Sequence, residues 1–237
     1  PHHTVSVQAL TGGGRRPKPG EISLATGGIL FLDELPEFSR AALETLRQPL
    51  EDREVTVSRV EATVTYPANF QLVAAMNPCP CGHFPDLTRC RCTEGQITRY
   101  LQKISGPLLD RIDLCVEASP VTYGDIRGGG ENEASGAIRA RVEQAREIQK
   151  ERFMEENIRC NGEMAGRHIR KYCVLGKEEE TFMEEIFEKL ALSARMHDRI
   201  LKVARTTADL AGESKIRLSD LCEAVSYVKI REKFWGN

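Results

Sequence analysis

Two adjacent acids, Asp33 and Glu34, directly follow the apolar run Ile29–Leu32. An uninterrupted apolar run of this length predicts a strand buried on both faces, as in a parallel sheet covered by helices. Acids at the C-terminal end of such a strand lie at the sheet edge where open α/β folds bind ligands. There the first carboxylate could hold Mg²⁺ and the second could polarise an attacking water molecule. A core strand that merely ends in acids fits these residues equally well.

Four of the eight cysteines form two close pairs, Cys79 with Cys81 and Cys90 with Cys92, whereas the other four are scattered. Two thiolate pairs joined by a short loop can converge on one tetrahedral ion, which suits Zn²⁺. Four thiolates leave no open coordination position, so the spacing predicts a structural zinc site rather than a catalytic one. Two disulfides or an iron–sulfur cluster remain alternatives. A metal site together with scattered thiols favours a reducing compartment.

Two more polar residues follow apolar segments. Asn77 comes after a strand predicted over residues 70–76, where its amide could orient a water molecule or a phosphate, or simply begin a turn. Arg111 stands between a leucine pair and a strand predicted over residues 112–117. It could pair with a neighbouring aspartate, or it could face the nucleotide of an adjacent subunit as an arginine finger.

The remaining candidates are cations in two segments of different character. Residues 1–20 are rich in glycine, proline and cations, which predicts a loop that is either phosphate-seeking or merely solvated. Its cations are Arg15, Arg16 and Lys18. Residues 54–66 alternate apolar and polar side chains, which predicts an antiparallel hairpin with Arg59 near its tip.

Helices are predicted on both sides of a glycine-rich linker at residues 128–133. Before the linker, short helices are expected over 21–25, over 39–47 with Pro49 ending that helix, and over 94–105. After it, a composition rich in Ala, Arg, Glu and Gln predicts a helix over 134–152, and apolar stripes predict helices over 178–191 and 193–211. Ser219 is expected to cap a last helix over 219–229. The sequence therefore predicts an α/β part followed by a helical bundle.

Composition limits the classes of function. A chain of 237 residues with a net charge of −2 can form one large or two modest domains and has no global basic excess for nucleic acid. No apolar run reaches the roughly 18 residues that span a membrane, and no signal peptide is present. We therefore expect a soluble cytoplasmic protein. Because the chain begins at Pro1 rather than Met, we also expect it to be a fragment.

Taken in order, these segments resemble an AAA+ ATPase. The order is a strand ending in Asp-Glu, a hairpin, a strand ending in Asn, the run Leu-Leu-Asp-Arg-Ile-Asp and a helical lid. The chain is identified more narrowly as a member of the ComM/YifB group of magnesium-chelatase-like proteins. The runs that carry this resemblance are PHHTVS (1–6), PGEISLA (19–25), FLDELPEFS (31–39), AMNPCPCG (75–82) and KVART (202–206).

The resemblance implies a fold and assigns roles by position. The fold is a partial P-loop-type parallel sheet with inserted hairpins at residues 1–127, the linker at 128–133 and an α-helical lid domain at 134–237. The implied roles are Walker B acids for Asp33 and Glu34, sensor 1 for Asn77, arginine finger for Arg111 and sensor 2 for Arg195, with Arg199 as second choice. Residues 8–20 correspond to the helix-2 insert of this clade, and Arg59 falls at the hairpin tip where related helicases carry a DNA-contacting cation. The resemblance therefore makes Arg15, Arg16, Lys18 and Arg59 the candidate contacts to the DNA backbone.

The implied activity is that of a homohexameric motor that uses ATP and Mg²⁺ to drive DNA branch migration during recombination of transforming DNA. The alternative is a chelatase-like chaperone subunit that remodels a protein partner and touches no DNA. The four-cysteine cluster matches the ComM-like group rather than the chelatase subunit.

One motif of the family is absent from this chain: no Gly-x-x-x-x-Gly-Lys-Ser/Thr occurs in it. That loop cradles the phosphates of ATP and supplies a lysine and a Mg²⁺-binding hydroxyl. In the family it precedes the position of Pro1. The polypeptide by itself is therefore expected to bind ATP poorly and not to hydrolyse it.

Overall fold

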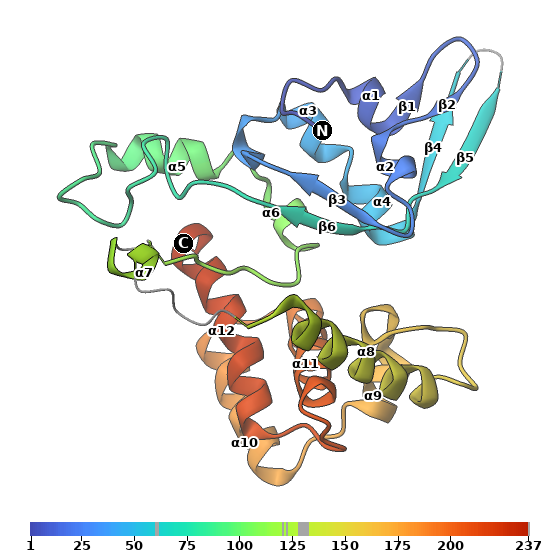
Figure 1. Cartoon of the computed structure of the whole chain (residues 1–237), viewed down its shortest axis with the longest axis vertical. Helices are drawn as coiled ribbons and strands as arrows, with labels where there is room; N and C mark the ends of the chain where they lie inside the picture. Colours follow the sequence, from blue (N-terminus) through green and yellow to red (C-terminus); the bar gives the residue numbers. More distant parts are fainter. Residues whose placement is uncertain (60–61, 120, 122, 128–132, 237) are drawn as a thin grey trace. The chain divides into compact units, whose positions relative to one another are not determined.

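The computed structural model describes the chain except for residues 60–61, 120, 122, 128–132 and 237 (Figure 1). It contains two compact units, one formed by Pro1–Ile112 with Phe234–Asn237 and the other by Asp113–Lys233. The first unit combines helices with strands and the second is helical, which confirms the predicted fold class. Most of the predicted linker lies outside the described residues. The described part of the chain has no helix with the length and apolar character needed to cross a bilayer.

The first unit contains six short strands and seven short helices among its described residues before residue 112. The strands are β1 (Gly12–Gly13), β2 (Lys18–Pro19), β3 (Ile29–Leu32), β4 (Glu54–Ser58), β5 (Thr63–Pro67) and β6 (Gln71–Ala74). The helices are α1 (Val7–Thr11), α2 (Glu21–Leu24), η1 (Leu35–Glu37), α3 (Arg40–Glu44), α4 (Arg47–Asp52), α5 (Glu94–Leu101) and α6 (Gly106–Leu109).

Strands β3 and β6 form a two-stranded parallel sheet, in register from Ile29 opposite Gln71 to Leu32 opposite Ala74 (Figure 1). The expectation that this strand is buried on both faces is wrong. Leu30 and Leu32 are buried, whereas Ile29 and Phe31 are 62% and 50% exposed. Because successive side chains of a strand point to opposite faces, one face of this small sheet packs on the core and the other stays open.

The segment after β3 corrects the predicted role of Pro49. Helix α3 begins at its N-cap Ser39, whose hydroxyl accepts the Ala42 N–H at 3.2 Å. Pro49 does not end the helical segment but lies in the first turn of α4 and is buried. A proline is tolerated there because the first backbone N–H groups of a helix have no intrahelical acceptor.

The predicted strand over 112–117 is also absent, since residues 112–119 have no regular secondary structure. Its alternating pattern suits a strand, but a strand needs a neighbour to accept its backbone hydrogen bonds. Among the described residues β3 and β6 are hydrogen-bonded only to each other, so this segment joins neither strand. The predicted hairpin, in contrast, is confirmed: β4 and β5 are antiparallel from Glu54 opposite Pro67 to Ser58 opposite Thr63.

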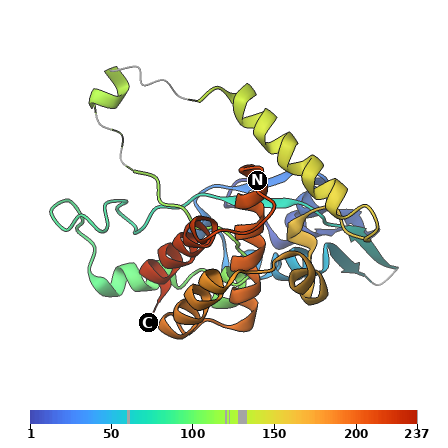
Figure 2. The same cartoon turned by 90° about the horizontal axis from the view of Figure 1, so that it is seen from below.

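The second unit is a bundle of helices around one apolar core (Figures 1 and 2). Its described helices are α7 (Tyr123–Arg127), α8 (Ser135–Arg152), η2 (Asn161–Glu163), α9 (Gly166–Tyr172), α10 (Lys177–Lys189), α11 (Ala194–Leu210) and α12 (Leu218–Trp235). The apolar stripe of α11, with Ile200 and Ala204 fully buried, lies at the centre of the core. Helix α12 ends later than the predicted residue 229, and its last residues belong to the first unit.

A buried polar network lies beside this core. Asp209 has a side chain with no exposed area, and it accepts hydrogen bonds from Arg152, Arg205 and the Asn161 amide at 2.5–3.1 Å. Arg205 also donates to the backbone carbonyls of Glu213 and Ser214. Every member therefore has partners, as a buried charge requires.

Candidate functional site

The two acids lie where β3 gives way to the short helix η1. The backbone of Glu34 is left-handed, with φ 53° and ψ 46°, and its N–H donates to the Asp33 carboxylate at 2.9 Å. This conformation is unfavourable for a residue with a Cβ, so its neighbours must hold it in place. They do so through the Glu37 N–H on the Glu34 carbonyl at 2.7 Å and the Leu35 N–H on the Ala75 carbonyl at 3.0 Å. Both acidic side chains are exposed.

Asn77 leaves the sheet at the same edge as the two acids. Leu32 is in register with Ala74, and the Ala75 N–H donates to the Leu32 carbonyl at 3.0 Å, so both chains leave together. Asn77 is exposed and carries an amide that can both donate and accept. The edge thus combines two carboxylates that suit Mg²⁺ with an amide that can donate to a phosphate.

His3 contacts this edge, although its chemistry was not predicted from the sequence. Its Nδ1 lies 3.0 Å from Oε2 of Glu34, and its ring packs edge-on against Phe38. In the sequence, the only hint of a polar role for His3 is the run Pro1-His2-His3-Thr4, and about thirty residues separate His3 from Glu34. Nothing in that spacing predicts the contact, because chain folding alone brings the two residues together.

The four clustered cysteines converge, with all their sulfur atoms within 4.8 Å of one another. The separations are 3.4 Å for Cys79–Cys81, 3.6 Å for Cys81–Cys90 and 3.8 Å for Cys79–Cys90. All eight cysteines are free thiols. The sequence-predicted residues therefore form one group that could hold a metal ion.

The environment of this cluster already favours one thiolate. Backbone N–H groups of His83 and Arg91 donate to the Cys81 sulfur and lower the pKa of Cys81 to about 6. Burial, followed by the interaction with Cys81, raises the pKa of Cys92 to about 12. A first thiolate that is already present is a favourable starting ligand for a cation, since the thiolate is the metal-binding form.

The chain's C-terminal aromatic residues pack against the cysteine loop. Phe84 in the loop meets Phe234 edge to face, with ring centroids 6.2 Å apart. Trp235 donates its indole N–H to the Leu101 carbonyl at 3.1 Å and packs in a small cluster that includes Cys79 and Cys90. The cysteine loop thus has a tryptophan at its side.

The predicted cations lie on two neighbouring hairpins of the first unit (Figure 1). The connection between β1 and β2 carries Arg15 and Arg16, Lys18 lies in β2, and Arg59 follows β4. The Tyr66 hydroxyl of β5 donates to the Pro17 carbonyl at 2.9 Å, which fastens one hairpin to the other. These four cations are exposed, and residues 60–61 of the hairpin tip lie outside the described residues.

Two glycines allow the first of these hairpins to close. Gly12 has φ +103°, and a Cβ there would lie 2.3 Å from the Lys18 carbonyl oxygen. A Cβ at Gly20 would lie 2.4 Å from both the Gly12 nitrogen and the Leu10 carbonyl oxygen. These contacts are with backbone, which cannot move aside, so only glycine fits at either position.

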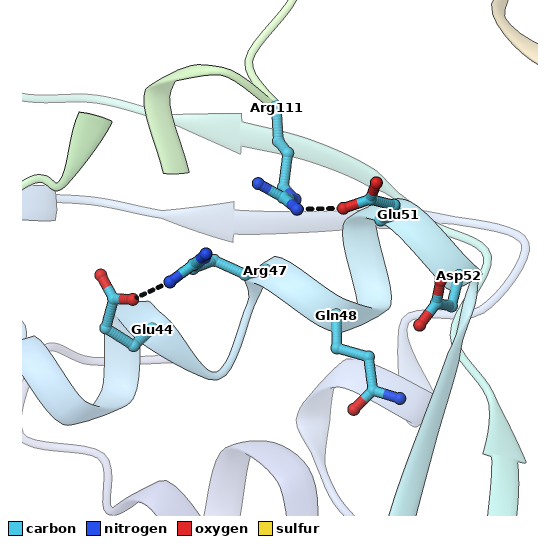
Figure 3. Close-up of a pocket in the computed structure, with 6 residues that line it drawn as sticks. All are labelled: Glu44, Arg47, Gln48, Glu51, Asp52 and Arg111. Carbon is cyan, nitrogen blue, oxygen red and sulfur yellow. Dashed lines mark hydrogen bonds and ion pairs between the residues drawn. The ribbon is translucent and has the colours of Figure 1, made fainter. Parts of the chain in front are cut away.

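Arg111 lies against helix α4. Figure 3 shows its guanidinium directed at Glu51, with which it forms an ion pair, and it also donates to the Pro107 carbonyl at 2.6 Å. Arg47 and Glu44 form a second ion pair at 2.7 Å in the same surface hollow. The structure thus gives Arg111 an ion-pair partner within the chain, Glu51, that lies 60 positions away in the sequence. Glu51 is a partner that sequence spacing did not predict.

Arg195 and Arg199, both in α11, have different environments within the helical unit. Arg195 is exposed in the first turn of α11, next to the cap in which the Ser193 hydroxyl accepts the Met196 N–H. Arg199, one turn further along, is 9% exposed and forms an ion pair with Asp113 at 2.7 Å. Arg199 thus forms an ion pair within its own unit and is buried, whereas the Arg195 side chain is exposed.

Comparison with protein families accounts for nearly the whole chain. Residues 1–126 match the family model described as magnesium chelatase, subunit ChlI. Residues 132–228 match the model for the C-terminal part of the same subunit. The boundary between the two models falls at the predicted linker.

The chain is also similar to curated bacterial proteins. It is 49% identical over 228 residues to the competence protein ComM of Haemophilus influenzae, and 46% identical over 228 residues to the protein YifB of Escherichia coli. In both comparisons the match covers 96% of this chain and 44% of the relative. The chain therefore spans less than half the length of the curated relatives it matches.

Proposed function

Because this chain belongs to the magnesium chelatase ChlI family, we propose that it is part of an AAA+ ATPase that moves DNA strands during recombination of transforming DNA. The observation that carries the ATPase proposal is the shared edge of β3 and β6, where Asp33, Glu34 and Asn77 leave the sheet together. The similarity to a relative named as a competence protein supports the choice of DNA as substrate.

At this edge each side chain has a task in phosphoryl transfer. Asp33 would hold Mg²⁺ bound to ATP, and Glu34 would orient water for in-line attack on the γ-phosphate. Asn77 would donate a hydrogen bond to the γ-phosphate. Arg111 and Arg195 would supply positive charge against the transition state, Arg111 from the adjacent subunit.

The phosphate-binding loop would come from the rest of the protein. Two observations support this part of the proposal: the chain has no Gly-x-x-x-x-Gly-Lys-Ser/Thr motif, and the open face of the β3–β6 sheet carries the exposed side chains Ile29 and Phe31. Large apolar side chains gathered on one sheet face suit burial under further chain. We therefore expect ATP hydrolysis from the complete hexameric protein and not from residues 1–237 alone.

The DNA contacts are assigned to the two linked hairpins. Arg15, Arg16, Lys18 and Arg59 are exposed on neighbouring elements, and the chain as a whole has no basic excess. Guanidinium and ammonium groups in such a cluster bind backbone phosphates without regard to base sequence. The contacts would thus suit a motor that must move along any strand.

We also propose that the cysteine cluster binds one structural Zn²⁺ ion. Zn–S bonds of about 2.3 Å in a tetrahedron place the sulfurs about 3.8 Å apart. The sulfurs of Cys79, Cys81 and Cys90 are 3.4–3.8 Å apart, and all four sulfurs lie within 4.8 Å of one another. A disulfide would need a separation of about 2.05 Å, and a cluster of several irons would hold its ligands further apart. The geometry thus favours a single tetrahedral ion among the three alternatives.

The test uses the complete protein and measures ATP hydrolysis with and without single-stranded or branched DNA. We expect stimulation by DNA, loss of turnover in Glu34→Gln, and weaker DNA binding in Arg59→Ala. Each lost phosphate contact should reduce the slope of log affinity against log salt by about one. Lys150→Ala is the matched control, because Lys150 is an exposed cation that pairs with Glu147 in the helical unit.

The competing function is that of a chaperone subunit, which the name of the matching family model favours. It predicts ATP turnover that ignores DNA and responds to a protein partner. Hydrolysis without any DNA response would therefore contradict the DNA motor, and a wild-type protein without hydrolysis would contradict the ATPase itself.

A further inference from the structure

The contact between His3 and Glu34 has the features of a built arrangement. Nδ1 of His3 lies 3.0 Å from Oε2 of Glu34. The His3 ring meets Phe38 edge-on with ring centroids 6.4 Å apart, whereas the ring of its chain neighbour His2 is exposed and has its centroid 4.0 Å away. Phe38 is 3% exposed, so the aromatic ring against which His3 packs is fixed in the core.

The other partner is constrained as well. Glu34 has the left-handed backbone described above, which fixes the direction in which its side chain leaves the chain. Its carboxylate is nevertheless 57% exposed, so beyond the backbone only a contact such as that with His3 restricts its rotamers. A half-exposed pair of this kind contributes little to stability.

We propose that His3 is a positioning residue for Glu34, an inference that rests on the proposed ATPase function. The Nδ1–H group of His3 donates to Oε2 and holds the carboxylate, which leaves Oε1 to accept a hydrogen bond from the attacking water. In hydrolysis the water oxygen forms a bond to the γ-phosphorus, the bond from phosphorus to the ADP oxygen breaks, and the water proton moves toward Glu34 and on to solvent. A carboxylate already turned toward the water avoids reorientation during that step.

The experiment compares three variants of the complete protein: His3→Ala, His3→Asn and His2→Ala. Asparagine places an amide donor close to the position of the imidazole Nδ1, so it can keep the hydrogen bond while it removes the ring. His2 is the matched control, because it is the adjacent histidine and its Nδ1 bonds to Thr4 rather than to Glu34. Steady-state kcat and KM for ATP are measured, together with the affinity for a non-hydrolysable ATP analogue in Mg²⁺.

We expect His3→Ala to lower kcat by about 10- to 100-fold, the range that misplacement of a reacting group causes, while KM and analogue affinity change less than about twofold. His3→Asn should recover most of the lost rate, and His2→Ala should stay within about twofold of the wild type. An unchanged or raised kcat in His3→Ala overturns the inference. So does a His3→Asn protein as slow as His3→Ala with lowered thermal stability, because that pattern indicates packing.

The outcomes separate this inference from the proposed function. If the wild type hydrolyses ATP and Glu34→Gln does not, the ATPase assignment stands and the His3 variants decide the positioning role alone. If the wild type does not hydrolyse ATP, or if Glu34→Gln is as active as the wild type, the proposed roles of both Glu34 and His3 are wrong.

Discussion

Removal of metal from the cysteine loop should loosen the loop and release Trp235. The perturbation is chelation of Zn²⁺ from the purified 237-residue chain or, genetically, Cys81→Ser. Cys81 is the suitable position because its side chain is exposed, whereas Cys79 is fully buried and its replacement would also disturb packing. Cys160→Ser, which removes an exposed free thiol in the helical unit, is the matched control.

The magnitude follows from how little else holds the loop. The apolar cluster beside it has only four buried members, Cys79, Ile97, Tyr100 and Leu101. An ion that binds only the folded state stabilises it by about 4 kcal/mol when free metal is about 1,000 times Kd. For a domain of roughly this size, 1 kcal/mol shifts the midpoint of unfolding by about 4–8 °C. Chelation should therefore lower the midpoint of the first unit by on the order of 15–30 °C.

Trp235 is the only tryptophan of the chain, so its fluorescence reports on this unit alone. Its indole is half-buried and donates to the Leu101 carbonyl, and both features should be lost when the loop opens. We expect about one zinc per chain by metal analysis, a red shift of tryptophan emission on chelation, and recovery on addition of Zn²⁺. Cys81→Ser should behave as the chelated protein and Cys160→Ser as the untreated one.

Several results would refute this reasoning. Absence of metal in the purified chain, with the four clustered thiols freely alkylated and no response to added Zn²⁺, would remove the zinc site. One iron per chain instead of zinc would keep the tetrahedral geometry and change the ion. A bound zinc whose removal leaves tryptophan emission and the unfolding midpoint unchanged would show that other contacts hold the loop.

Three further changes test the packing. Gly20→Ala should lower the free energy of unfolding of the first unit by about 1–3 kcal/mol in urea, because the added Cβ would lie 2.4 Å from backbone atoms. Gly95→Ala is the control, because a Cβ there meets nothing within 4 Å. Equal stability of the two variants would be inconsistent with the close approach at Gly20. Asp209→Ala should lower the free energy of unfolding by about 3–5 kcal/mol, because it leaves the buried Arg205 without its carboxylate partner. Glu147→Ala is the control and should lower it much less, because Glu147 belongs to an exposed ion pair. Similar losses of stability in the two variants would argue against the buried network. Lys171, followed by Tyr172, lowers the pKa of Glu156 from 4.5 to about 2. A carboxylate with a lowered pKa contributes stability that is complete above pH 4.5 and is lost as the pH falls toward 2. The free energy of unfolding of Glu156→Gln should therefore depend less on pH in that window than that of the wild type. Parallel pH profiles of the two proteins would exclude this role for Glu156.

Much of the fold follows from local patterns in the sequence. The alternation in residues 54–66 predicted the hairpin, because an antiparallel pair needs only a short turn and adjacent residues. The apolar stripes predicted the helices over 178–191 and 193–211, because helix bonds join residues four apart. Ser219, predicted to cap the last helix, instead lies inside α12. The two wrong predictions share a cause, because each depended on a feature that the local pattern does not contain. The strand predicted at 112–117 needed a partner strand, and the role of Pro49 depended on where the next helix begins.

The sequence by itself determined which side chains are the candidates for chemistry: the Asp33–Glu34 pair, the amide of Asn77 and the four clustered cysteines. Residue type and close spacing are sufficient to identify these candidates. Acids that follow an apolar strand, and thiols that are close in sequence, stay near one another in any fold that forms the strand and the loop. The tertiary structure alone decided their partners, His3 for Glu34, Glu51 for Arg111 and Trp235 beside the cysteine loop. These contacts join residues that are far apart in the sequence, and such contacts depend on how the whole chain packs rather than on any local pattern.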